Sequence, residues 1–143
     1  MANMSNYLEQ QLARHLFRSA SFPKPSQLAI ALCTVVPAES DTTLAGKEVA
    51  NANGYTRMAA NPSDTAWSEA QNADGDWYVT NTADIVFPQA TGPWGTVTAI
   101  AICDSATYGA GQMLFWATLP EPKSVGTGDS FILPAGSVVV TFK

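Results

Sequence analysis

The chain has 143 residues, a formal net charge of −5, and a composition that is 46% hydrophobic and only 13% charged. This length is typical of one domain, and the charged fraction is about half that of an average globular protein. The acidic balance argues against a nucleic-acid-binding protein, because phosphate contacts require clustered lysine and arginine side chains.

The charge is unevenly distributed along the chain. Residues 1–25 carry three basic and one acidic side chain, a net charge of +2, whereas the remainder carries four basic and eleven acidic side chains, a net charge of −7. No stretch is long and apolar enough to cross a membrane, and the N-terminus lacks the basic, apolar and cleavage regions of a signal peptide. We therefore expect a protein made in the cytoplasm, without nucleic acid or membrane partners.

The first predicted element is a helix that begins after Ser5, a residue type that often caps helix N-termini. Leu8, Leu12 and Leu16 recur at every fourth position and form one apolar stripe, which Phe17 widens. An isolated helix of this length is only marginally stable in water, so the stripe must pack on something. It either covers an open end of its own domain or docks on a neighbouring subunit.

Serines and prolines end this helix near residues 19–21 and predict an extended arm up to residue 25. We divide the chain into this N-terminal helix and arm, residues 1–25, and one β-domain, residues 26–143. The helix and arm have the features of a docking element, and their predicted partner-binding residues are Leu8, Leu12, Arg14, Leu16, Phe17, Arg18 and Phe22.

The β-domain is predicted from short apolar runs separated by turn residues. Residues 27–34 alternate bulky and small apolar side chains, which indicates a core strand. Residues 38–46 predict an exposed loop, and residues 48–50 and 55–58 predict a hairpin around the Asn-Gly turn at residues 51–54. In that hairpin, Tyr55 and Arg57 would share one face. Residues 61–76 predict a long loop, pinned to the domain by Trp67 and Trp77.

Residues 94–119 form the predicted centre of the domain, as two antiparallel strands joined by an exposed loop. In the first of these strands, residues 97, 99, 101 and 103 give a small apolar face and residues 100 and 102 give a bulky one, so both faces are expected to be covered. Further strands are predicted at residues 84–87, 130–133 and 137–142. Seven or eight short strands indicate an all-β, antiparallel two-sheet β-sandwich, jelly-roll-like, with one N-terminal α-helix.

The sequence holds little that predicts chemistry. His15 is the only histidine, and the motifs of hydrolases, zinc sites and phosphate-binding loops are absent. Residues 72–76 resemble a calcium loop but lack its closing glutamate, so they predict a tight turn. Acidic side chains such as Glu48 are expected to stay solvated on the sandwich rim. We expect no enzyme, no cofactor and no metal, and two buried free thiols at Cys33 and Cys103.

Several segments resemble, in their order and spacing, a family of small tailed-phage structural proteins, which are labelled tail fibre proteins or capsid decoration (cement) proteins. The segments in the C-terminal half are residues 85–90, 94–97, 102–104, 114–119, 123–129 and 134–136, with Phe131. Those in the N-terminal half are residues 7–8 and 28–32, with Gly54, Tyr55 and Arg57. The resemblance implies a β-sandwich that binds other virion proteins and has no catalytic residue.

From this resemblance we expect a virion component, a capsid cement protein that binds and stabilises the shell of major capsid protein as a homo-oligomer, a dimer or trimer. A tail fibre or tail-tip component is the alternative, although the chain shows no repeats and no coiled-coil heptads. A carbohydrate-binding module, using exposed aromatic side chains in the loops, is a further alternative.

Overall fold

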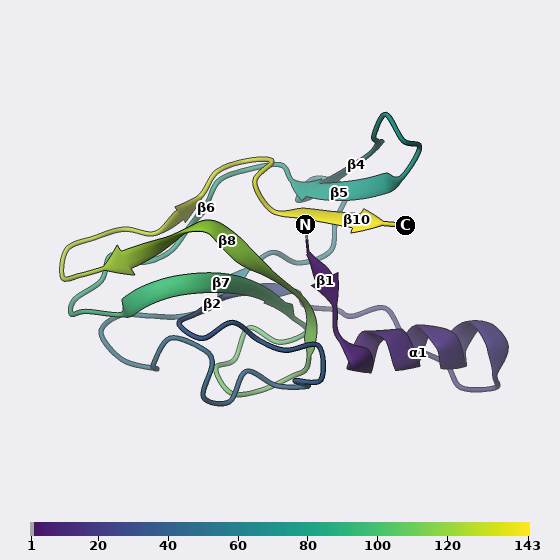
Figure 1. The fold of residues 1–143 in the computed structure, drawn as a ribbon, viewed down its shortest axis with the longest axis horizontal. Coiled ribbons are helices and arrows are strands. Elements are labelled where there is room, and N and C mark those ends of the chain that lie inside the picture. The colour runs from purple at the N-terminus through teal and green to yellow at the C-terminus, as the bar shows by residue number, and fades with distance from the viewer. Residues whose placement is uncertain (1) are drawn as a thin grey trace.

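A five-stranded antiparallel sheet forms the centre of the structure (Figure 1). Its strands, in spatial order, are β1 (Asn3–Met4), β8 (Met113–Val125), β7 (Gly95–Cys103), β2 (Ala29–Cys33) and β3 (Met58–Ala59). The computed structural model describes residues 2–143. The predicted central pair is confirmed, because β7 and β8 are antiparallel neighbours.

Two smaller sheets lie over one face of the five-stranded sheet (Figure 1). One contains β10 (Val139–Phe142), β5 (Trp77–Asn81) and β4 (Trp67–Gln71), and the other contains β6 (Ile85–Val86) and β9 (Ile132–Leu133). Residues 2–143 thus contain ten strands, some of only two residues, and the single helix α1 (Asn6–Phe17). The predicted all-β sandwich with an N-terminal helix is confirmed, while the jelly-roll-like order stays a prediction.

Both faces of β7 are buried, as its sequence predicts. Ile100 and Ile102 belong to the core between the sheets, whereas Ala99 and Ala101 belong to a second core on the opposite face. Val97 was predicted to lie with the alanines, but it packs in the core between the sheets. The reason is a register shift between Val97 and Ala99, because one irregularity moves a side chain to the other face.

A loop covers the second core. Residues 38–46 were predicted to be exposed, but Leu44 is 4% exposed and packs against the small side chains of β2 and β7. Small alanines leave space for a loop to approach the sheet closely. The loop is held by the backbone N–H of Met113, which donates to the carbonyl of Thr42 at 2.8 Å.

β8 continues through Pro120 and Pro122, beyond the predicted end of the strand at Leu119. The prolines are tolerated because β7 pairs with Thr118 and then with Lys123, and skips the residues between them. Proline has no N–H to donate, so it fits where a strand has no ladder partner.

The predicted hairpin around residues 51–54 is wrong in its pairing but correct in its turn. Asn53 and Gly54 both have positive φ angles, of 55° and 81°. The two flanking segments do not pair with each other, because each finds a partner on β2. Glu48 bridges to Cys33, and β3 pairs with the start of β2.

The predicted long loop at residues 61–76 is also wrong, because β4 lies within it and forms a hairpin with β5. The turn of this hairpin is tight, as predicted for residues 72–76. The side-chain oxygen of Asn72 accepts hydrogen bonds from the backbone N–H groups of Asp74 and Asp76, at 2.9 and 3.0 Å. Trp67 is partly buried and donates its indole N–H to the carbonyl of Ala60, whereas Trp77 is 52% exposed and anchors nothing.

A buried ion pair joins two segments that follow β2, one at Glu48 and one at Arg57. Arg57 donates from Nε to Oε1 of Glu48 and from Nη2 to Oε2, each at 2.8 Å, and both side chains are almost completely buried. Tyr55 shares the face of Arg57, as predicted, and donates its hydroxyl to Glu48 at 2.8 Å. The expectation of a solvated Glu48 is therefore wrong. The guanidinium of Arg57 balances its negative charge, and the positions of the two residues in the sequence do not predict this pairing.

Arg57 also holds the loop between β7 and β8. Its Nη1 donates to the carbonyl oxygens of Ser105 and Ala110, at 3.0 and 2.8 Å. Burial lowers the pKa of Arg57, but the hydrogen bonds to Glu48 and the electrostatic attraction of Cys103, Glu48 and Tyr55 together outweigh it, so the pKa is raised and the side chain stays charged. Burial, and then the Glu48 carboxylate, raise the pKa of Tyr55, which therefore remains a hydrogen-bond donor.

Replacing Arg57 should destabilise the fold strongly. We expect Arg57→Met to lower the free energy of unfolding by about 3 to 5 kcal/mol, because it leaves the buried Glu48 carboxylate without a counter-charge. The control is Lys47→Met, which removes a partly exposed ion pair with Asp41 and should cost less than about 1 kcal/mol. Urea unfolding measures both, and equal losses would contradict this role of Arg57.

Cys33 and Cys103 are both free and buried, which confirms the prediction of two free thiols. Burial raises the pKa of Cys103 to about 12 and that of Cys33 further still. Because only the thiolate reacts with disulfide reagents, we expect neither thiol of the folded chain to react with Ellman's reagent at mildly alkaline pH. Denaturant should release two reactive thiols per chain, and rapid reaction before unfolding would show that a cysteine is accessible.

Candidate functional site

The helix α1 is attached to the domain at its first turn. Ser5 is fully buried, and its backbone N–H donates to the carbonyl of Leu114 at 2.9 Å. Its hydroxyl donates to the carbonyl of Met113 at 2.6 Å and accepts from the backbone N–H of Leu8 at 3.3 Å. Ser5 is thus the N-cap of the helix, as predicted, and also its anchor to the start of β8.

The rest of α1 extends away from the domain (Figure 1). Leu8 is buried and Leu12 is half-buried, but Leu16 is 70% exposed and Phe17 is 85% exposed. The interpretation that the stripe covers its own sandwich is therefore correct only for the first turn. Within residues 2–143, no side chain covers the outer end of the stripe.

The basic side chains lie on the same outer part of the helix. Arg14 and Arg18 are exposed, and the helix ends where Arg18 adopts an extended conformation. Phe22 is half-buried, and its backbone N–H donates to Nδ1 of His15 at 3.1 Å, which folds the arm back beside the helix. We call residues 12–18 the outer half of α1. Of the seven predicted partner-binding residues, five lie there, and Leu8 belongs to the anchor.

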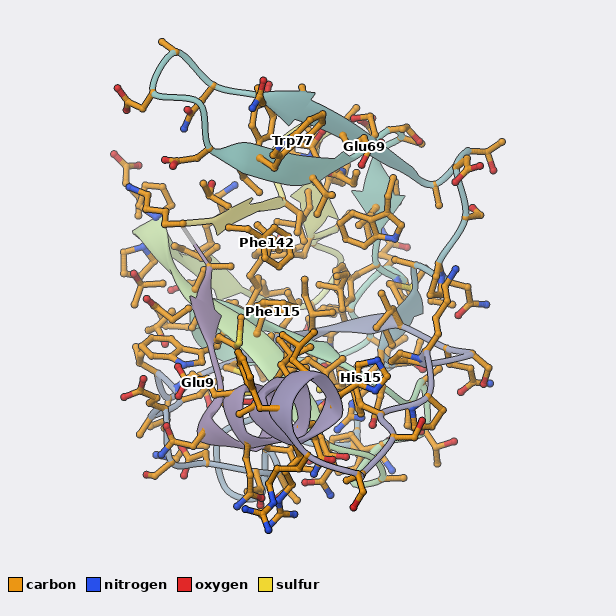
Figure 2. The ribbon with its side chains drawn as sticks, turned by 90° about the vertical axis from the view of Figure 1, so that its right-hand side faces the viewer. Glu9, His15, Glu69, Trp77, Phe115 and Phe142 are labelled. Carbon is orange, nitrogen blue, oxygen red and sulfur yellow. The ribbon has the colours of Figure 1, made fainter. Side chains whose placement is uncertain are left out.

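A groove that sequence reasoning missed opens beside the helix, between the five-stranded and three-stranded sheets. It has a volume of about 500 Å³, and Ile102, Phe115 and Phe142 line its apolar part. The rings of Phe115 and Phe142 meet edge to face with centroids 6.2 Å apart, and Figure 2 shows them above the end-on helix. Exposed Asp64 and Glu69 lie on its rim. We call this the helix-side groove.

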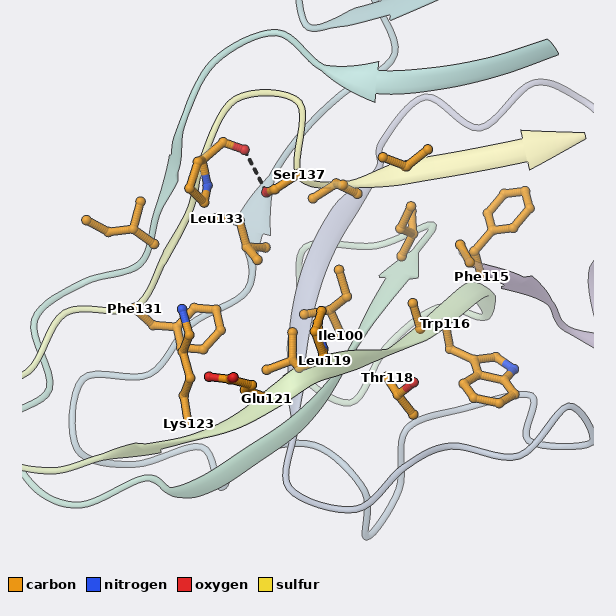
Figure 3. A pocket seen from close by; sticks show the side chains of 18 residues that line it. Ile100, Phe115, Trp116, Thr118, Leu119, Glu121, Lys123, Phe131, Leu133 and Ser137 are labelled. Carbon is orange, nitrogen blue, oxygen red and sulfur yellow. Dashed lines mark hydrogen bonds between the residues drawn. The ribbon is translucent and has the colours of Figure 1, made fainter. Parts of the chain in front are cut away.

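A second groove of about 450 Å³ opens toward β9 (Figure 3). Its apolar part includes Ile100, Leu119 and Phe131, and its charged lining residues are Glu121 and Lys123. We call this the β9-side groove. The two grooves share Ile102 and Phe115, so both are openings of one interior that the smaller sheets leave partly uncovered.

The sequence contained few signals for these grooves, because their residues come from distant strands that converge only in the fold. The clearest signal is Phe142, a large aromatic residue at the end of the last strand, which is 45% exposed. Exposed apolar side chains next to an apolar groove are typical of a protein-binding surface.

The described residues, 2–143, contain no group of three or more histidine, cysteine, aspartate or glutamate side chains that could hold a metal ion. In the same range, no helix is long and apolar enough to cross a membrane. The buried polar cluster around Glu48 is filled with hydrogen bonds, so it has a structural function. The surface features that remain are the outer half of α1 and the two grooves.

Comparison with known proteins adds one finding. A family described as Podophage GP4 fiber I protein gp80 matches residues 3–141, which is nearly the whole chain. No curated protein matches it.

The exposure of Leu16 and Phe17 predicts that they do not stabilise the fold. We expect Leu16→Gln combined with Phe17→Gln to change the free energy of unfolding by no more than about 0.5 kcal/mol, because surface substitutions rarely do more. Glutamine is a good helix former and adds no charge at the helix C-terminus. Leu8→Ala, in the anchored turn, should cost about 2 kcal/mol or more. Urea unfolding followed by tryptophan fluorescence measures both, and a large loss in the double variant would mean that the stripe packs on its own domain.

Proposed function

The chain belongs to the Podophage GP4 fiber I protein gp80 family, and we propose that it is a fibre-type structural component of a tailed-phage particle that attaches through the outer half of α1. It is a virion protein that binds other proteins and catalyses no reaction. The family supports a phage structural protein, and the fibre assignment that we propose follows the family's description.

The observation that carries this proposal is the exposed end of the helix stripe. Leu16 and Phe17 are large apolar side chains that are exposed to solvent, on a helix whose first turn is fixed to the domain. Burying each of them against a partner would contribute about 1.5 to 3 kcal/mol. Amphipathic helices that dock into apolar grooves are a common mode of protein recognition, with anchor side chains on one helical face.

Capsid decoration is the second candidate. In that case the chain would bind the major capsid protein and stabilise the shell. The described domain supports it by being a short sandwich without an extended shaft, and the sequence contains no heptads from which a coiled-coil fibre could form.

Particle composition tests the proposal. We expect quantitative mass spectrometry of purified particles to find far fewer copies of this chain than of the major capsid protein. A copy number comparable to that of the capsid protein would favour decoration instead. Absence of the chain from particles would contradict both assignments.

Incorporation of variants tests the attachment. Leu16→Gln with Phe17→Gln should weaken binding to the particle about 100-fold or more, because two apolar anchors are lost at about 1.5 kcal/mol or more each. Val35→Gln is the control, since Val35 is an exposed apolar side chain on the domain and does not belong to α1. Incorporation of the double variant at the level of the unmodified chain would contradict attachment through α1.

A further inference from the structure

The outer half of α1 and the helix-side groove lie on the same side of the molecule. Figure 2 looks along α1 and shows Phe115 and Phe142 between the helix and the β4 hairpin, with Glu69 on that hairpin. The anchor at Ser5 directs the helix outward, so Leu16 and Phe17 remain exposed and do not fill the groove of their own chain. The chain therefore presents an apolar helix and an apolar groove side by side.

The helix-side groove is large enough for the stripe. An apolar cavity of about 150 Å³ holds a benzene molecule. The groove, at about 500 Å³, therefore has room for the phenyl ring of Phe17 and neighbouring leucine side chains. Its apolar lining includes Phe142, which is itself 45% exposed. Docking of the helix in the groove would therefore remove both apolar surfaces from water.

The charges of the two surfaces are complementary. Arg14 and Arg18 flank the stripe, and exposed Asp64 and Glu69 flank the groove. Lys24 of the arm also lies on this rim, so the net charge of the three rim residues is −1. The charged lining residues of the β9-side groove, Glu121 and Lys123, have no net charge, so that groove does not favour a basic helix over an acidic one. Charge therefore favours the helix-side groove as the site for a basic helix.

We propose that the outer half of α1 of one copy docks in the helix-side groove of a second copy, so that two copies exchange their helices. In a two-fold arrangement each copy supplies one helix and one groove, and the contact closes without leaving either surface free. This inference rests on the proposed function in taking α1 as the assembly contact. It deepens it by identifying the partner of α1 as a second copy of this chain, so that the unit that enters the particle is a pair of copies joined through α1.

Disulfide trapping tests which surfaces meet. Full-length Ala13→Cys, which keeps both apolar anchors, and full-length Ser68→Cys are mixed and oxidised, and peptide mass spectrometry identifies the joined sites. Ser68 lines the helix-side groove and is exposed, while the two native thiols are buried. We expect a disulfide between the two variants. The matched control pairs Ala13→Cys with Glu121→Cys, in the β9-side groove, and should give little disulfide.

Charge reversal tests the complementarity by sedimentation velocity. One variant carries Arg14→Glu and Arg18→Glu, and the other carries Asp64→Lys and Glu69→Lys. Each alone should self-associate about tenfold more weakly than the unmodified chain, because like charges then face each other across the contact. An equimolar mixture should recover association, since its mixed dimer matches each helix with an oppositely charged rim. Failure of the mixture to recover would overturn the charge argument.

The outcomes separate this inference from the proposed function. Equal trapping at Ser68→Cys and Glu121→Cys, or none at either, would overturn helix exchange. If trapping fails but Leu16→Gln with Phe17→Gln still removes the chain from particles, α1 docks on a different virion protein and the proposed function stands. If trapping succeeds but the double variant enters particles normally, helix exchange stands and attachment through α1 fails.

Discussion

The antiparallel pairing of β7 with β8 determines where the helix, the core and the grooves lie. β8 pairs with β7 along most of its length, and its first carbonyls hold Ser5 and thereby the root of α1. The same strand places Phe115 in both grooves. A single strand therefore connects the core, the direction of the helix and the apolar openings of the sandwich. A shift of β8 along β7 would disturb all three.

Much of the core could be predicted because its signals are local. Residues 27–34 and 95–103 alternate small and bulky apolar side chains, and both became buried strands. The Ser5 cap and the leucine spacing also predicted the helix correctly. In each case neighbouring residues along the chain determine the structure, and no distant partner has to be known.

The features that could not be predicted depend on distant partners. β4 is a mostly polar, partly exposed segment. It forms a strand because it pairs with β5, to which a tight turn joins it. Leu44 is buried because alanines on the sheet leave room for its loop. Glu48 is buried because Arg57 balances its charge. The grooves likewise combine strands from both ends of the sequence, so no single stretch reveals them. The helix stripe was recognised, but its exposure depends on the direction set by Ser5.

A cryo-electron microscopy map of the assembled particle would reveal whether the outer half of α1 is an assembly contact. We expect continuous density around Leu16 and Phe17, with both side chains packed in an apolar groove of a neighbouring chain. A fully occupied copy whose α1 extends into solvent, touching no other chain, would contradict it.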